Sequence, residues 1–208
     1  MLSYKIIRTQ DLTTSSWSGG TTTQLAIYPE NTVYAERNFK WRVSTAKVDI
    51  EESTFTQLPH VSRIIMPLQG TLHLVHEGHH ESLLKPFEQD SFMGDWKTVC
   101  YGKAIDFNLM ITEGEGMVKA LDILPFAALK IPILPEFHEN SWKYFSLIIY
   151  PLSGIEIQLA NEEPVKVAEQ EVIILTDKLR DVGEDQSIRV KNYNGVTINI
   201  IQAFICHN

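Results

Sequence analysis

The chain repeats one seven-residue pattern, and this repeat limits its architecture more than any other feature. Residues 64–70 read I-I-M-P-L-Q-G and residues 148–154 read I-I-Y-P-L-S-G, so five of the seven positions are identical at an offset of 84 residues. In both copies an apolar run leads through Pro and Gly into an alternating segment, which is typical of a strand, a turn and a returning strand. The repeat predicts duplication of one β unit; the alternative is a chance match between two β-rich halves.

Short strands account for most of the other sequence. No window of more than about a dozen residues has the 3.6-residue periodicity of a helix, and turn signals recur between the apolar segments. The expected strands are 1–12, 25–28, 41–48, 102–111, 144–150, 155–159, 172–175, 188–192 and 196–204. Between the two halves, Pro125, Pro132 and Pro135 are expected to interrupt any regular element in residues 117–140. This pattern predicts an all-β sandwich or barrel fold.

Composition and charge argue against two kinds of partner. The formal net charge is −8 and the pI is about 5.3, and no Lys/Arg cluster is present that would bind nucleic acid or an anionic membrane. No apolar run approaches the roughly 18 to 20 residues of a membrane span, and the N-terminus lacks the apolar core of a signal peptide. We therefore expect a cytoplasmic protein. Cys100 and Cys206 have no metal or redox spacing and are expected to serve as small apolar residues.

The histidines argue against a metal centre. His73 and His76 are three residues apart on an expected strand, so their side chains point to opposite faces. His79 and His80 lie at a Gly-containing hairpin tip, where solvated polar residues are usual. We expect no metal and no cofactor, and regard adventitious nickel or zinc binding as the alternative. Nucleophile motifs such as G-x-S-x-G are also missing from the sequence.

Five polar residues stand inside apolar strands and are the candidate site. Arg42 and Ser44 share one face of their strand, Asp106 and Asn108 share one face of another, and Arg63 enters the repeated strand. These faces line either a cavity or a solvated outer surface. A buried arginine needs a partner. The partner is either Asp106 or a carboxylate ligand held by the bidentate guanidinium, and the sequence leaves both open.

Several short motifs in residues 4–113 resemble the HutD/Ves family of bacterial proteins. They are Trp17-x-Gly19-Gly20-x-Thr22, Trp41-Arg42-Val43-Ser44-x-Ala46, Phe55 with Leu58-Pro59-x-Val61-x-Arg63, Leu68-x-Gly70, Phe92-x-Gly94, and Gly102-x-x-x-Asp106-Phe107-Asn108-Leu109-Met110. The resemblance implies a bicupin, with two tandem jelly-roll β-barrels from one chain. This agrees with the internal duplication, and we place the barrels at residues 1–118 and 119–208, with exchange of strands between the halves allowed.

The resemblance also implies a function. Members of the family are often encoded alongside histidine-utilisation enzymes, and binding of a small acidic intermediate such as formylglutamate or urocanate, to limit pathway flux, is the role attributed to them. No catalytic activity is established for the family. By position, the ligand-binding residues would be Trp17, Arg42, Ser44, Arg63 and Asn108, with no catalytic residue and no metal ligand.

The chain departs from the family pattern at a few positions. Gln24 stands where the family commonly has Glu, Ser62 where an Asp is usual and His60 where a Gly is usual. Metal-binding cupins place two His and a Glu before the turn glycine and another His after the next one. The segment before Gly70 holds only His60, and Lys97 stands near the later position, so the resemblance and the spacing agree on a metal-free barrel.

The sequence therefore predicts a bicupin that binds a small carboxylate metabolite in its N-terminal barrel. Arg42 and Arg63 would anchor the anion, and Ser44 and Asn108 would orient it. A homodimer formed through edge strands is compatible with the sequence.

Two other classes of function are also compatible with the sequence. One is a metal-independent cupin enzyme, an isomerase or hydrolase acting on a small polar metabolite, with Asp106 or His60 as general base. The other is an interaction protein whose barrels are scaffolding, for which an exposed apolar patch without a cavity would be the mark.

Overall fold

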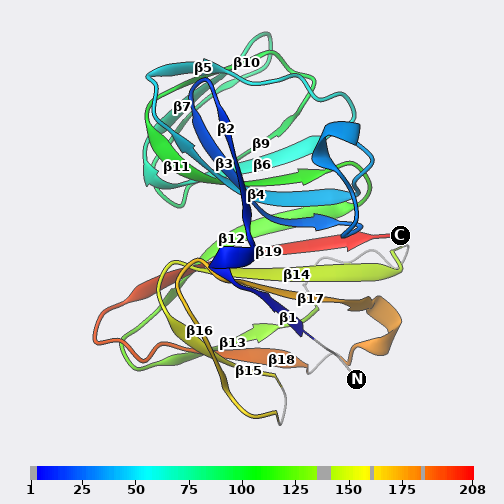
Figure 1. Cartoon of the computed structure of the whole chain (residues 1–208), viewed down its shortest axis with the longest axis vertical. Coiled ribbons are helices and arrows are strands. Elements are labelled where there is room, and N and C mark those ends of the chain that lie inside the picture. The colour runs from blue at the N-terminus through cyan, green and yellow to red at the C-terminus, as the bar shows by residue number, and fades with distance from the viewer. Residues whose placement is uncertain (1–3, 135–141, 160–161, 184–185) are drawn as a thin grey trace. The chain divides into compact units, whose positions relative to one another are not determined.

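Regular structure in the protein is almost entirely β, as a computed structural model shows (Figure 1). The structure describes residues 4–134, 142–159, 162–183 and 186–208. Its helices are single 3-10 turns: η1 (Thr9–Asp11), η2 (Tyr34–Glu36) and η3 (Leu179–Asp181). None of the helices in these ranges is long and apolar enough to cross a membrane.

The chain divides into two compact units. One is residues 12–113, and the other combines residues 1–11 with residues 114–208. The division falls before the expected residue 118, because β12 (Glu115–Ile123) pairs with β19 (Ile198–His207) in the second unit. The exchange of strands that the sequence allowed is that of β1 (Tyr4–Ile7), which pairs with β17 (Val172–Lys178) at the edge of a sheet in the second unit. Pairing between strands so far apart in the chain leaves no local signal in the sequence.

The unit of residues 12–113 is built from two antiparallel sheets. In the six-stranded sheet the order is β2 (Thr13–Trp17), β3 (Gly20–Tyr28), β4 (Trp41–Val48), β11 (Ala104–Ile111), β6 (Ser62–Gly70) and β9 (Asp90–Met93). In the four-stranded sheet the order is β5 (Glu52–Thr54), β10 (Thr98–Tyr101), β7 (Leu72–His76) and β8 (Glu81–Leu84).

The other unit also has two antiparallel sheets. The five-stranded sheet runs β1, β17, β14 (Tyr144–Pro151), β19 (Ile198–His207) and β12 (Glu115–Ile123). The four-stranded sheet runs β13 (Ala128–Pro132), β18 (Ser187–Lys191), β15 (Ile155–Leu159) and β16 (Val165–Val167).

Strand order shows that the two units repeat one jelly roll. The order β4-β11-β6-β9 corresponds to β12-β19-β14-β17, and β5-β10-β7-β8 corresponds to β13-β18-β15-β16, always with a shift of eight strands along the chain. The repeated sequence pattern lies at equivalent places, since Pro67 pairs with Asp106 and Pro151 pairs with Ile200. The prediction of an all-β bicupin is confirmed.

The proline-rich region between the halves is more regular than predicted. Residues 117–140 were expected to lack regular structure, but β12 and β13 lie there. Pro132 is the last residue of β13, and this strand pairs only with β18 at the sheet edge, where a missing backbone N–H costs nothing. Pro125 lies between the two strands, and Pro135 lies outside the described residues.

Each unit has a core of apolar side chains. In residues 12–113, Leu72 and Leu74 pack with Phe92 and Cys100, while a second cluster surrounds Met110. Cys100 and Cys206 are free and buried, and burial raises the pKa of their thiols to about 12 and about 11. The prediction that both cysteines act as small apolar residues is confirmed.

Gly70, the last residue of the first repeat, is required by its backbone conformation. Its φ is +83°, and a Cβ at this position would lie 2.4 Å from the carbonyl oxygen of Lys103. We expect Gly70→Ala to lower the free energy of unfolding by about 1–3 kcal/mol. Chemical denaturation measures this. Gly78 is the control, because its φ is also positive, at +78°, but its added Cβ would meet nothing within 4 Å. Gly78→Ala should therefore cost less, and equal losses would contradict a contribution from the contact with Lys103.

Candidate ligand-binding site

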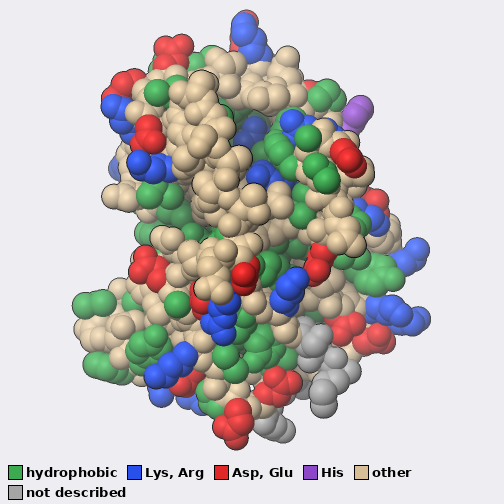
Figure 2. Space-filling model, in the orientation of Figure 1, with side chains coloured by type: hydrophobic (Ala, Val, Ile, Leu, Met, Phe, Trp, Pro, Cys, Tyr) green, Lys and Arg blue, Asp and Glu red, His purple; other side chains and the backbone are tan. Residues whose placement is uncertain are grey.

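A cavity of about 300 Å³ opens inside the unit of residues 12–113. Because strand side chains alternate between faces, β4, β6 and β11 each send every second residue into it. The lining residues from these three strands are Arg42, Ser44, Ala46, Val48, Arg63, Ile65, Asp106, Asn108 and Met110. Figure 2 shows a hollow in this unit beside the β2–β3 hairpin, with blue basic side chains inside it.

The structure brings all five sequence-predicted ligand-binding residues to the lining of this one cavity: Trp17, Arg42, Ser44, Arg63 and Asn108. Register explains the grouping of four of them. Met110 pairs with Arg42 on one side and with Arg63 on the other, and Asn108 pairs with Ser44. The interpretation of these faces as a solvated outer surface is wrong, because Arg42 and Arg63 are only 5% and 6% exposed.

Arg42 is held in place by neutral partners. Its Nε donates to Gln24 Oε1 at 3.0 Å, and a terminal nitrogen donates to Ser44 Oγ at 3.1 Å. Its guanidinium also stacks on the ring of Tyr34, 4.1 Å from the centroid, while Arg37 covers the same ring at 4.0 Å. Burial lowers the pKa of Arg42, as does the neighbouring charge of Arg37. The neutral side chain of Gln24 fixes the guanidinium without cancelling its charge.

Arg63 is buried between aromatic rings. Its guanidinium lies 4.7 Å from the ring centroid of Phe55 and 5.1 Å from that of Phe92. Its Nε is buried without a hydrogen-bond partner. Burial lowers the pKa of Arg63 to about 10, and the group is still a cation at neutral pH.

Asp106 does not neutralise these arginines by direct pairing. Among the described residues no ion pair joins a carboxylate to Arg42 or Arg63, and Asp106 Oδ1 is buried without a hydrogen-bond partner. Burial raises the pKa of Asp106 to about 7, although Arg63 lowers it. Asn108 Oδ1 is also buried and unpartnered. The cavity thus combines two cations, a titratable carboxyl and an unused acceptor.

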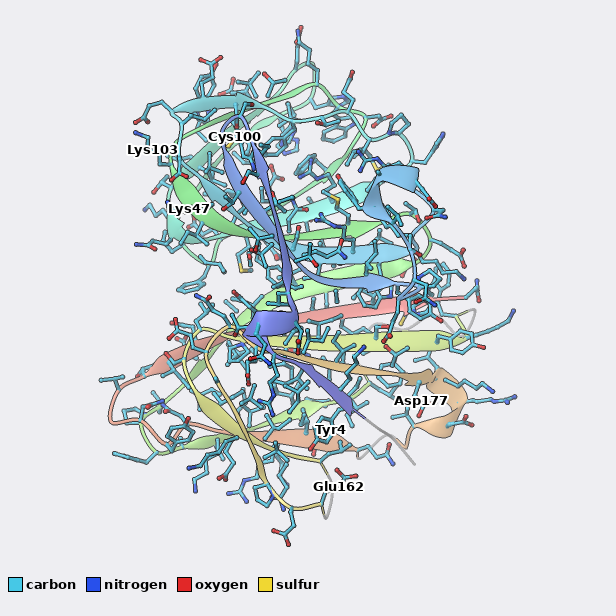
Figure 3. The ribbon with its side chains drawn as sticks, in the orientation of Figure 1. Tyr4, Lys47, Cys100, Lys103, Glu162 and Asp177 are labelled. Atoms are coloured by element: carbon cyan, nitrogen blue, oxygen red, sulfur yellow. The ribbon has the colours of Figure 1, made fainter. Side chains whose placement is uncertain are left out.

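Two surface lysines of the same unit differ from the cavity arginines in having carboxylate partners. Lys47 and Lys103 lie at its edge in Figure 3, and both are exposed. Lys47 pairs with Asp49 at 2.8 Å and Lys103 with Glu51 at 2.7 Å. These two lysines therefore have carboxylate partners, which Arg42 and Arg63 lack among the described residues.

The second barrel has no charged residues at the positions that correspond to Arg42, Arg63 and Asp106 of the first. Strand register places apolar residues at the corresponding positions of the repeat. The equivalent pairs are Arg63 and Leu147, Arg42 and Met117, and Asp106 and Ile200. Leu147 and Ile200 belong to the apolar core of their barrel, and Met117 packs against it. One jelly roll therefore supports both a filled interior and a charged cavity, and the residues at these registers decide which forms.

A family model adds sequence information to this geometry. The model of HutD matches residues 9–181, which is most of the chain. The chain belongs to the HutD family. No curated protein matches it by sequence.

Solved structures similar to this HutD-family protein have the same bicupin fold. PA5104, a conserved protein of unknown function from Pseudomonas aeruginosa PAO1, has a TM-score of 0.76 and 19% identity over 99% of this chain and 100% of that chain. HutD from Pseudomonas fluorescens SBW25 has a TM-score of 0.66 and 17% identity over the same shares. A Bacillus subtilis oxalate decarboxylase mutant has a TM-score of 0.62 and 6% identity, over 98% of this chain and 77% of that one. At sequence identities this low, the structural similarity shows that these proteins share a fold with this chain.

Sequence reasoning placed Trp17 in the HutD-family cavity but missed its other aromatic residues, Tyr34 and Phe55. Tyr34 lies in η2 and Phe55 follows β5, and neither belongs to an alternating strand. Each of these rings contacts an arginine that is distant in the sequence, so only the tertiary structure shows that it lines the cavity. His60, offered as an alternative general base, is exposed and does not line the cavity. Asp106, the other alternative, does line it.

Proposed function

We propose that this HutD-family protein is a cytoplasmic bicupin that binds a small carboxylate metabolite in the cavity of residues 12–113. The observation that carries the proposal is the pair of buried guanidiniums, Arg42 and Arg63, without a carboxylate partner among the described residues. A buried charge without a counter-charge is costly by several kcal/mol. An anionic ligand supplies the missing counter-charge, so its binding recovers that cost.

The cavity also constrains the size and polarity of the ligand. Its volume of about 300 Å³ is at the lower end for small-molecule sites. Asn108 Oδ1 and Asp106 Oδ1 are unused acceptors and favour a ligand that carries an N–H or O–H donor. Two guanidiniums favour two carboxylates over one. A formylglutamate-like acid offers all of these groups, and a urocanate-like acid offers one carboxylate and an N–H.

The regulatory role is the second part of the proposal. Membership of the HutD family supports it, together with the link of that family to histidine utilisation. Binding of a pathway acid without turnover would make the protein a sensor of that acid's concentration.

A thermal-shift screen of small acids tests the proposed ligand class. A binder at 100 times its dissociation constant adds about 2.7 kcal/mol of stability, which raises the melting temperature by several degrees. We expect such a shift with formylglutamate, urocanate or a related acid, and a smaller shift with the uncharged amide of the same acid. A panel of small acids that leaves the melting temperature unchanged would rule the class out.

One observation favours a second candidate, a metal-independent isomerase or hydrolase. Asp106 lies in the cavity, and burial raises its pKa to about 7, the range in which a general base works best near neutral pH. Incubation of the protein with the acid that binds, followed by product analysis, separates the two. A catalyst would convert the acid at a rate that Asp106→Asn removes, whereas a sensor returns it unchanged.

A further inference from the structure

A second cluster of polar side chains lies in the same barrel, outside the carboxylate cavity. His76 ends β7, His80 lies in the turn that follows, and Asp90 begins β9. The Nε2 atom of His76 is 3.1 Å from Asp90 Oδ2, and the Nε2 atom of His80 is 3.0 Å from both carboxylate oxygens. None of the three residues lines the cavity. Two imidazoles from one hairpin thus converge on one carboxylate.

The hairpin turn sets the position of the two imidazoles. The backbone N–H of His76 donates to the carbonyl of His80 at 2.9 Å, and that of His79 donates to the carbonyl of His76 at 2.9 Å. Gly78 supplies the positive φ of the turn, +78°. The centroids of the His76 and His80 rings lie 4.7 Å apart. Their separation is therefore fixed by backbone hydrogen bonds and ring packing.

Aromatic rings enclose the inner part of the cluster. Phe92 lies 4.5 Å from the His76 ring and Trp96 lies 5.6 Å from it, measured between centroids. The His76 side chain is fully buried, and that of His80 is 39% exposed. The cluster therefore has a closed inner side and an open outer side, at which a solvent molecule or a small ligand can reach it.

The protonation states suit metal coordination. Burial lowers the pKa of His76, which favours the neutral imidazole that binds metals. Burial alone would raise the pKa of Asp90, but hydrogen bonds from Ser82, His80 and His76 lower it, so this carboxyl is an anion. Neutral imidazole and carboxylate are the forms that ligate a divalent ion.

Thr98 holds the remaining nitrogen of His76. Its Oγ1 lies 2.8 Å from His76 Nδ1, and it also reaches the carbonyl oxygen of Trp96 at 3.4 Å. The hydroxyl can donate to Nδ1, or accept from it and turn its own hydrogen to that carbonyl. Nε2 is thus free to carry a proton or a metal. Metal-binding histidines usually have such a partner on the other nitrogen.

We propose that His76 Nε2, His80 Nε2 and the Asp90 carboxylate bind one Zn²⁺ ion, with the fourth position open to water. All pairs of ligand atoms in this set lie within 4.8 Å of one another, so small rotations bring them to a common ion. Three nitrogen or oxygen ligands and an open position are typical of catalytic zinc sites. The site departs from the metal-free barrel expected from the sequence, and its residues differ from the positions at which metal-binding cupins were expected to hold an ion.

Metal titration of protein that carries no histidine tag tests the site. After removal of metals by a chelator, Zn²⁺ is titrated by calorimetry, and Co²⁺ is titrated while its visible absorption is recorded. We expect one ion per chain and the absorption of a four-coordinate Co²⁺ centre. His80→Ala removes a half-exposed ligand without opening the core, and should weaken binding by more than the 10- to 100-fold typical of losing an outer partner.

His73→Ala is the matched control. His73 lies on the same strand and contacts Glu81 at 3.1 Å, so it forms a histidine–carboxylate pair that lacks a third ligand. This variant should bind Zn²⁺ as the parent protein does. Asp90→Asn keeps the size of the third ligand and should also weaken binding. Absence of stoichiometric binding by the parent, or equal affinity in the parent and His80→Ala, would overturn the proposal, as would an equal loss in His73→Ala.

Discussion

Arg63→Leu should greatly weaken binding of the carboxylate and at the same time make the free protein more stable. Arg63 is 6% exposed with an unpartnered Nε, and burial lowers its pKa to about 10. Removing a buried charge that has no direct ion pair among the described residues should raise the free energy of unfolding by about 1–3 kcal/mol. Losing a buried partner of an anionic group costs about 2–5 kcal/mol of affinity, or at least about 30-fold in the dissociation constant. Calorimetric binding and chemical denaturation measure the two effects.

Leucine is the appropriate replacement because it occupies the equivalent position of the second barrel. Leu147 occupies the same register of the second barrel, where the interior is filled by apolar residues. Lys47→Met is the matched control, since it removes one positive charge from the exposed edge of the same unit and should leave affinity unchanged. An Arg63→Leu protein that binds the acid as tightly as the parent would refute the role of this residue. A less stable one would refute the claim that burial of its charge costs more than its electrostatic interaction with Asp106 returns.

Carboxylate binding should weaken as pH rises above about 7, and Asp106→Asn should remove this dependence. Burial raises the pKa of Asp106 to about 7. Below this pH the carboxyl is neutral and can donate a hydrogen bond to the ligand. Above it the carboxylate repels the ligand and competes for Arg63, so the dissociation constant should rise by close to tenfold per pH unit. Calorimetry from pH 6 to pH 9 measures the slope for both proteins.

The free energy of unfolding should also depend on the protonation of Asp106. The pKa of Asp106 rises from 3.8 to about 7 on folding, so the protonated form stabilises the fold below about pH 4 and this contribution is lost between pH 4 and pH 7. The loss should be on the order of 2–4 kcal/mol and should be missing from Asp106→Asn. The other charged groups lining the cavity are Arg42 and Arg63, and the pKa of Arg63, about 10, lies above this range. Identical pH profiles for the two proteins would contradict the assignment to Asp106.

The alternation of residues in the strands determined which side chains share the cavity. Arg42 and Ser44 are two apart on β4, and Asp106 and Asn108 are two apart on β11, so each pair had to face one side of its sheet. The repeated pattern at Ile64 and Ile148 determined that the fold is a duplication. These inferences succeeded because they rest on local geometry, which a strand imposes wherever it lies.

Tertiary structure alone decided what those side chains contact. Whether Arg63 pairs with Asp106 depends on the register of β6 and β11 and on rotamers, and the structure leaves their charged groups without a direct ion pair. The convergence of His76 and His80 on Asp90 likewise needs a turn and a third strand. The sequence determines which side chains of a strand share a face, because the backbone geometry of a strand repeats every two residues. It also shows the internal repeat directly, as a repeated pattern of residues. The hydrogen bonds, ion pairs and burial of these side chains depend on residues that are close in space but distant in the sequence, so the sequence alone does not predict them.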